Sequence, residues 1–134
     1  MEGSQAYNFS VKSQIHDYSV KFINDLDTTL NIELIEGDFI IIDNKIIKLY
    51  NNLISKTLVT HKYLGIDSSE PQKSYQEITP IIEFLIEQGF RKNHRLVAVG
   101  GGITQDVTAF IASIMYRGVD WIFFPTSLLA QGDS

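Results

Sequence analysis

Three consecutive glycines stand between a short apolar run, residues 96–99, and a stretch with helical spacing. Glycine has no Cβ, so backbone N–H groups can approach an anion closely, and a following helix points its positive end there. The pattern predicts a turn in which Gly101 and Gly102 donate to a diphosphate. A tight strand-to-helix turn without a ligand would use the same residues. The spacing also differs from the Gly-x-Gly-x-x-Gly of the usual dinucleotide site.

Polar side chains end two other apolar runs. Asp43 follows residues 39–42, and Thr126 and Ser127 come shortly after residues 119–124. A carboxylate at a strand end can accept both hydroxyls of a ribose, but Asp is also a favoured N-cap for a following helix. The two interpretations of Asp43 have equal weight. The hydroxyls of Thr126 and Ser127 could bind a cofactor or close a turn.

Charged residues near the expected helix ends have simple structural explanations. Glu70 and Lys73 form Glu-x-x-Lys in a loop, and such surface pairs contribute little. Asp106 is expected in the first turn of the helix after the glycines, and Arg117 near its last turn, where the helix dipole stabilises each charge. Asp133 has no structural interpretation from its neighbours.

Taken together, these motifs resemble the 3-dehydroquinate synthase family. The resemblance rests on Gly-Gly-Gly-x-x-x-Asp from Gly100, on Arg-Gly-Val from Arg117, and on Pro-Thr-Ser-Leu-Leu-Ala-Gln-x-Asp-Ser from Pro125. Iron-dependent alcohol dehydrogenases and glycerol dehydrogenases are similar at the glycines and Asp106, but they lack the other two motifs. The family's Glu-x-x-Lys-Ser also matches residues 70–74, where cyclases that make valiolone usually differ.

The resemblance implies a site for NAD. Gly101 and Gly102 would hold the diphosphate, Asp43 would face the adenosine ribose, and Glu70 and Lys73 would contact the cofactor.

The remaining motif residues are implied to lie nearer the substrate. Thr126 and Ser127 would bind the nicotinamide half, and Asp106 would point at the nicotinamide ribose and the substrate hydroxyl. Asp133 would orient the substrate. Arg117 would reach across a homodimer interface toward the partner's substrate. Two positions differ from the family pattern: Gln105 replaces a glycine and Gly132 an apolar residue.

The reaction implied is cyclisation of 3-deoxy-D-arabino-heptulosonate 7-phosphate to 3-dehydroquinate and phosphate, with catalytic NAD and a divalent metal, usually zinc. The family's metal ligands lie in a C-terminal helical domain that this sequence lacks. We therefore expect residues 1–134 to be the NAD-binding domain, with no metal ligands and no turnover alone. The alternatives are another sugar-phosphate cyclase, a glycerol- or iron-type polyol dehydrogenase, or a non-catalytic nucleotide-binding module.

Composition limits the class of protein. The 134 residues carry a net charge of −5, which argues against a nucleic-acid partner. They contain no cysteine, which excludes disulfides. Neither a signal peptide nor an apolar run of about 20 residues is visible. We expect a cytoplasmic protein with no membrane partner.

Apolar patterning predicts a three-layer, Rossmann-like α/β domain with a mainly parallel sheet. We expect strands near residues 39–43, 57–61, 96–99 and 119–124, and an N-terminal β-hairpin over residues 9–22. Three caps are predicted as well: Ser74 in a capping box with Glu77, Gly89 at a helix end, and Thr104 before the helix that follows the glycines. Pro80 should either kink its helix or begin it after Thr79.

Overall fold

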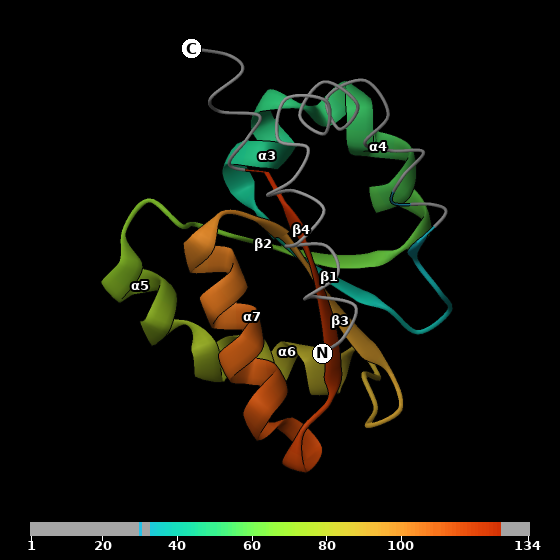
Figure 1. Ribbon diagram of the computed structural model, residues 1–134, viewed down its shortest axis with the longest axis vertical. Helices are drawn as coiled ribbons and strands as arrows, with labels where there is room; N and C mark the ends of the chain where they lie inside the picture. Colours follow the sequence, from blue (N-terminus) through green and yellow to red (C-terminus); the bar gives the residue numbers. More distant parts are fainter. Residues whose placement is uncertain (1–29, 31–32, 127–134) are drawn as a thin grey trace, which may run out of the picture.

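The computed structural model describes residue 30 and residues 33–126. In that part of the chain, parallel strands form a sheet in the order β2-β1-β3-β4 (Figure 1). The strands are β1 (Phe39–Asp43), β2 (Lys62–Ile66), β3 (Arg95–Gly100) and β4 (Asp120–Pro125). All three neighbouring pairs are parallel, so every strand ends at the same edge of the sheet.

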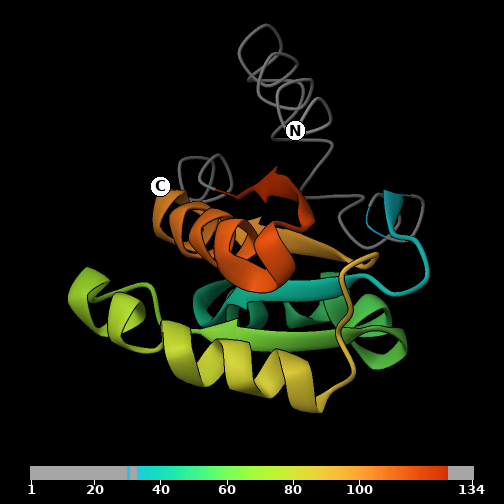
Figure 2. The ribbon, with the colours of Figure 1, turned by 90° about the horizontal axis from the view of Figure 1, so that it is seen from below.

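Helices connect the strands across both faces. The helices α3 (Asn44–Leu49) and α4 (Asn51–Thr60) join β1 to β2. The connection from β2 to β3 contains α5 (Pro71–Gln76) and α6 (Ile78–Glu87). Between β3 and β4 lie α7 (Gly102–Ile114) and the 3₁₀ turn η1 (Met115–Arg117). Seen from below, α5, α6 and α7 lie in front of the strands, with α3 and α4 behind them (Figure 2). The three-layer prediction is confirmed, whereas the hairpin over residues 9–22 lies outside the described residues.

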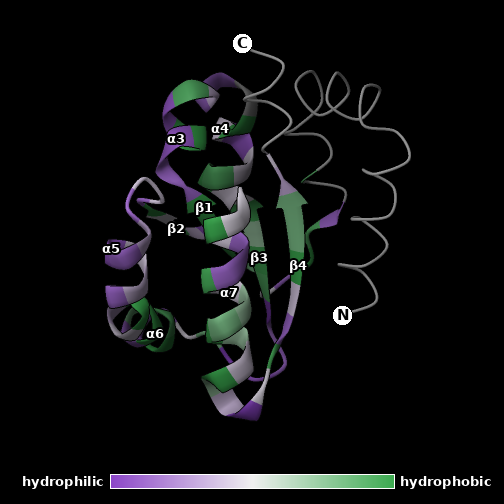
Figure 3. Ribbon diagram, turned by 60° about the vertical axis from the view of Figure 1, so that its left-hand side comes forward, coloured by the Kyte–Doolittle hydropathy of each residue, from purple (hydrophilic) through white to green (hydrophobic). Residues whose placement is uncertain are grey.

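Alternation along the strands fills the two halves of the core. Phe39 and Ile41 pack with α6 and α7, whereas Ile40 and Ile42 pack with α3 and α4. Strands β3 and β4 divide in the same way, and both are hydrophobic over most of their length (Figure 3). A strand buried on both faces reads as a continuous apolar run, which is why β1, β3 and the edge strand β4 lie where the sequence predicts them.

The second strand lies a few residues after its predicted place. Residues 57–60 complete α4, so the strand expected at 57–61 is wrong, and β2 begins at Lys62. Ile54 and Leu58, four residues apart, bury one face of α4, while Val59 is 85% exposed. The strand was missed because only Ile66 in β2 is fully buried, whereas β4 at the other edge of the sheet is buried over most of its length. A half-exposed strand lacks the strong apolar run that marks a buried one.

The predicted capping box at Ser74 and Glu77 is also wrong. Ser74 lies inside α5, whose first residue is Pro71, and its buried hydroxyl donates to the backbone oxygen of Asp67 at 2.5 Å. Pro80 is the third residue of α6, where the backbone N–H has no partner within a helix anyway. A continuous α5–α6 helix would need that missing N–H, and this accounts for the break at Glu77.

Gly89 ends α6 as predicted. Its φ is +83°, and its N–H donates to the backbone oxygen of Ile86 at 3.1 Å. Glycine adopts this left-handed conformation without the cost that a Cβ imposes.

Candidate functional site

The connections place a switch point between β1 and β3. From β1 the chain moves to β2 on one side, and from β3 it moves to β4 on the other. In open α/β sheets, ligands bind in the crevice beyond the carboxyl ends of the strands at such a point. Asp43 ends β1, the glycine turn follows β3, and Thr126 follows β4. The fold therefore gathers Asp43, the two predicted glycines and Thr126 at one crevice.

A cavity of about 180 Å³ opens between these strand ends. It is smaller than the roughly 300–1,000 Å³ of a typical complete ligand site, so the described residues enclose only part of a large ligand. Its walls combine predicted residues with an apolar side from α3 and its end: Asp43, Lys45, Ile46, Leu49, Tyr50, Gly101 and Thr126.

Asp43 is held at both carboxylate oxygens. The backbone N–H of Lys45 donates to Oδ1 at 2.9 Å, so Asp43 is the N-cap of α3. The Ser68 hydroxyl donates to Oδ2 at 2.5 Å. The side chain is largely buried, yet each oxygen keeps capacity for a further hydrogen bond. The capping interpretation is confirmed, and nothing in this geometry conflicts with the ribose interpretation.

The three glycines of the turn have different structural roles. An added Cβ at Gly100 would lie 2.5 Å from the Thr104 hydroxyl oxygen, so packing requires glycine there. At Gly101 and Gly102 an added Cβ would meet nothing within 4 Å. The φ of Gly101 is −98° and its ψ is −161°, an extended conformation that any residue adopts, and Gly102 begins α7. Neither packing nor backbone conformation explains these two glycines.

The start of α7 is uncapped by side chains. Its N-cap is Gly101, and the first intrahelical bond runs from the N–H of Gln105 to the oxygen of Gly101 at 3.0 Å. The preceding N–H groups of the first turn have no partner within the helix. The predicted Thr104 cap is therefore wrong: Thr104 is fully buried in the first turn, and no described atom bonds its hydroxyl. A half-buried Gln105 stands where the resemblance expects glycine, and it does not line the cavity.

The loop after β2 is held by serines. Asp67 accepts from the Ser69 hydroxyl at 2.6 Å and from the Ser69 N–H at 3.0 Å, and these bonds hold the pKa of the Asp67 carboxyl below its usual value. Lys73 and Lys45 lower this pKa further through their charge. The loop then continues into Glu70, the N-cap of α5.

Glu70 and Lys73 lie beside the crevice without lining the cavity. Both side chains are exposed at the start of α5, which follows the carboxyl end of β2. Their position in the described part of the chain leaves them available to a ligand larger than the cavity.

The other charged residues lie at the two ends of α7. Asp106 is exposed, but it is the fifth residue of the helix, so its predicted place in the first turn is wrong. Arg117 follows the far end of this 13-residue helix, roughly 20 Å from the glycine turn at 1.5 Å per residue. It therefore cannot reach the crevice of this chain. Ser127 and Asp133 lie outside the described residues.

Sequence reasoning missed the apolar wall of the cavity and the serine that holds Asp43. Ile46, Leu49 and Tyr50 follow Asp43 at spacings of three and four residues, a pattern that marks one face of a helix leaving a strand end. That pattern could have identified the wall. Ser68 had no comparable signal, because its partner lies 25 residues earlier in the chain.

A larger cavity, about 260 Å³, lies at the opposite edge of the sheet. Phe39 and Lys62, which begin β1 and β2, both line it, and it contains none of the predicted site residues. Its His94 accepts the N–H of Arg91 through Nδ1 at 3.0 Å, and its His61 uses Nδ1 toward the oxygen of Thr57 at 3.0 Å. We favour the smaller cavity because ligands of open α/β sheets bind at the carboxyl edge.

Among residues 30 and 33–126, no three His, Cys, Asp or Glu side chains could together hold a metal ion. None of the helices in the described ranges combines the length and apolar character needed to cross a membrane.

Comparisons with known proteins add a family match. Residues 63–134 match the family model "3-dehydroquinate synthase N-terminal". The 3-dehydroquinate synthase of Streptococcus equi subsp. equi is 38% identical over 130 residues, covering 92% of this chain and 36% of that protein. The enzyme of the same name from Clostridium tetani is 31% identical over 136 residues, covering 100% of this chain and 35% of that protein. The chain thus spans about a third of the length of these relatives.

Solved structures show a similar fold. A 2-epi-5-epi-valiolone synthase from Streptomyces hygroscopicus subsp. jinggangensis, with NAD⁺ and Zn²⁺ bound, gives a TM-score of 0.59 at 23% identity. That match covers 69% of this chain and 27% of the other. A 2-deoxy-scyllo-inosose synthase complexed with carbaglucose-6-phosphate, NAD⁺ and Co²⁺ gives a TM-score of 0.59 at 24% identity, covering 76% and 31%. At these identities the likeness concerns the fold.

Proposed function

The chain belongs to the 3-dehydroquinate synthase family, and from this we propose that it is the NAD-binding part of a 3-dehydroquinate synthase. The whole enzyme would convert 3-deoxy-D-arabino-heptulosonate 7-phosphate to 3-dehydroquinate and phosphate. The substrate would be this small sugar phosphate, and we expect a cytoplasmic enzyme.

The open space at Gly101 and Gly102 carries this proposal. Both glycines stand where an added Cβ would meet nothing within 4 Å, and they lie at the N-terminus of α7, which no side chain of the described residues caps. A ligand that must approach the backbone closely explains glycine at both positions. The donors and the helix dipole favour an anion, which the NAD diphosphate supplies.

The neighbouring residues fit the rest of the cofactor. Asp43 can accept the hydroxyls of the adenosine ribose, since each of its oxygens retains acceptor capacity. We assign Thr126 and Ser127 to the nicotinamide half, and Glu70 and Lys73 to cofactor contacts from the loop beside the crevice. Asp106 is assigned to the nicotinamide ribose and the substrate hydroxyl.

In this proposal the side chains of the chain bind and orient the cofactor and the substrate. Bound NAD would supply reversible hydride transfer, the chemistry that side chains lack. Asp133 would hold the polar groups of the substrate beside the nicotinamide. A divalent metal, usually zinc in the family, would need ligands other than those in the described residues. Arg117 would serve the partner's site in a homodimer, in keeping with its place at the far end of α7.

Phosphate release tests the activity. The assay supplies the heptulosonate phosphate, NAD and a divalent metal, and compares the 134-residue chain with the longest protein encoded by the same reading frame. We expect the longer protein to release phosphate and form 3-dehydroquinate without net NADH, and the chain alone to do neither. In the longer protein, Asp43→Ala should raise the NAD concentration needed for half-maximal rate, whereas Glu83→Ala, an exposed residue of α6, should leave it unchanged.

Three results would contradict the proposal. Net NADH formation on glycerol would indicate a polyol dehydrogenase. A cyclic product from a different sugar phosphate, with none from the heptulosonate, would indicate another cyclase. If neither protein binds NAD, the proposal is wrong at the cofactor step itself.

A further inference from the structure

We infer that Ser68 is a positioning residue for ribose recognition, fixing the Asp43 carboxylate in the orientation that accepts the adenosine ribose hydroxyls. The inference rests on the proposed function. Its direct observation is the 2.5 Å hydrogen bond from the Ser68 hydroxyl to Oδ2 of Asp43, which joins the loop after β2 to the end of β1.

The Asp43 carboxylate needs two anchors to hold one plane. The N–H of Lys45 engages Oδ1 alone, and a carboxylate held at one oxygen can still turn about its last side-chain bond. The Ser68 bond engages the other oxygen and removes that freedom. Each oxygen then has one acceptor direction left, and the two directions are fixed together. Such a pair of acceptors matches two adjacent hydroxyl groups on a ribose ring.

The loop that carries Ser68 is itself fixed on both sides. Asp67 accepts the Ser69 N–H and hydroxyl on its side chain, and its backbone oxygen accepts the hydroxyl of Ser74 at 2.5 Å. Ser74 is only 1% exposed within α5, so this anchor belongs to the packed body of the domain. Because hydrogen bonds hold this loop in place, the Ser68 hydroxyl restricts the position of the Asp43 carboxylate that accepts from it. Ser68 therefore transmits the rigidity of α5 to the carboxylate at the crevice.

A positioning role and a purely structural role of Ser68 predict different effects of removing its hydroxyl on ligand affinity. A structural bond would contribute to stability and would affect every nucleotide alike. A positioning bond should matter only to ligands that carry the hydroxyls that Asp43 accepts. The pair of probes is therefore NAD and its dideoxy analogue, which lacks both the 2′- and the 3′-hydroxyl of the adenosine ribose.

The experiment is calorimetric titration of both ligands into the 134-residue chain, with folding checked by circular dichroism. Wild-type protein should bind NAD about tenfold more tightly than the dideoxy analogue, the size expected for a hydrogen bond to a charged group. In Ser68→Ala this preference should fall to about twofold, because NAD binding weakens while binding of the analogue hardly changes. Ser68→Thr, which keeps the hydroxyl, should restore the preference. Ser113→Ala, which removes an exposed hydroxyl bonded within α7, should leave it at the wild-type value.

The outcomes distinguish a failure of the positioning role of Ser68 from a failure of the proposed NAD binding. If wild-type protein prefers NAD and Ser68→Ala keeps the full preference, the positioning role is wrong while NAD binding stands. If Ser68→Ala weakens both ligands equally, the bond is only structural, and the inference is again wrong. If wild-type protein binds neither ligand, or binds both equally, Asp43 does not accept hydrogen bonds from the ribose hydroxyls. The proposed binding mode then fails together with the inference.

Discussion

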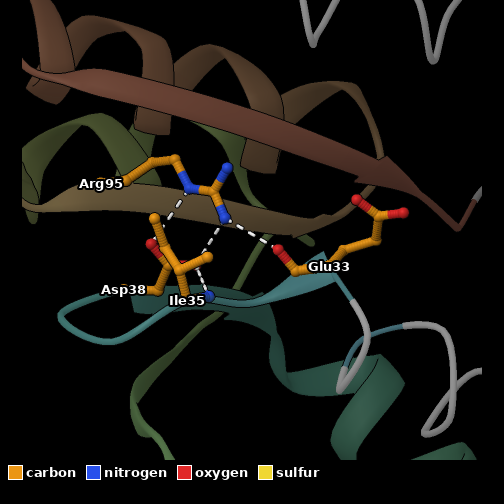
Figure 4. A network of polar contacts seen from close by, with 4 residues as sticks. All are labelled: Glu33, Ile35, Asp38 and Arg95. Atoms are coloured by element: carbon orange, nitrogen blue, oxygen red, sulfur yellow. Dashed lines mark hydrogen bonds and ion pairs between the residues drawn. The ribbon is translucent and has the colours of Figure 1, made fainter.

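Arg95 holds Asp38 through a two-point ion pair at the amino edge of the sheet. Its Nε donates to Oδ1 at 3.0 Å and its Nη2 donates to Oδ2 at 2.7 Å (Figure 4). The same Nη2 donates to the backbone oxygen of Glu33 at 3.0 Å, and the N–H of Ile35 donates to Oδ2 of Asp38 at 2.9 Å. The pair therefore ties the segment before β1 to the first residue of β3, at the edge opposite the candidate site.

Replacing Arg95 should destabilise the fold. The Asp38 side chain is 0% exposed and that of Arg95 is 22% exposed, so Arg95→Met would leave a buried carboxylate without its counter-ion. We expect a loss of about 3 kcal/mol in the free energy of unfolding, measured by urea denaturation. Lys92→Met is the control, because exposed Lys92 donates to the backbone oxygen of Tyr116, and it should cost under about 1 kcal/mol. Equal losses in the two variants would contradict this role for Arg95.

Substitutions at Gly100 and Gly101 should have different effects: the first should lower the stability of the fold, and the second should lower the affinity for NAD. Gly100→Ala forces a Cβ within 2.5 Å of the Thr104 hydroxyl, and we expect it to destabilise the fold by about 1–3 kcal/mol. Gly101→Val enters open space, so its stability should stay within about 1 kcal/mol of wild type, while NAD binding is lost. Urea denaturation and calorimetry measure the two quantities. A folded Gly101→Val that binds NAD normally would place the diphosphate elsewhere.

Strands β1, β3 and β4 were predictable because each is buried on both faces. Residues 39–43 form β1, and residues 96–99 and 119–124 overlap β3 and β4, since an uninterrupted apolar run has few other uses in a domain of this size. Edge strand β2 gave no such run and was placed too early. Helix starts were harder still, because Ser74 and Thr104 have hydroxyls typical of caps but are buried inside their helices. A sequence pattern does not say which neighbours bury a side chain.

The site was predictable where local sequence determines it and unpredictable where the tertiary fold does. Asp43, Gly101 and Thr126 each follow a strand, and parallel strands bring their ends to one edge. Ser68 joins the site only because β2 lies beside β1 in the sheet. The distance of Arg117 from the crevice likewise depends on the direction of α7, which local charge patterns do not reveal.

The Asp67 carboxyl should respond to its serine neighbour. The Ser69 hydroxyl is the largest cause of the lowered pKa, so Ser69→Ala should raise this pKa toward the ordinary 3.8. A lowered folded-state pKa stabilises the fold above the unfolded value, and that contribution disappears as the pH falls through the folded value. NMR titration of the carboxyl carbon measures the change. Lys73→Met removes only a charge and should raise the pKa less; a larger rise there would contradict the assignment.

The buried hydroxyl of Thr108 should be a net cost to stability. Thr108 is 0% exposed, and no atom of the described residues forms a hydrogen bond with its Oγ1. Thr108→Val replaces the hydroxyl with a methyl group of similar shape, and we expect about 1 kcal/mol of added stability in urea denaturation. Ser113→Val on the exposed face of α7 is the comparison and should show no such gain. A destabilised Thr108→Val would mean that the hydroxyl has a partner.

Amide chemical shifts test the central claim most directly. NAD is titrated into the ¹⁵N-labelled 134-residue chain, and shifts are followed at both edges of the sheet. We predict that the largest changes fall on Gly101, Gly102 and Thr126, at the carboxyl edge. Changes centred on Gly37 and Gly89, which line the larger cavity at the opposite edge, would contradict the account, as would no change at saturating NAD.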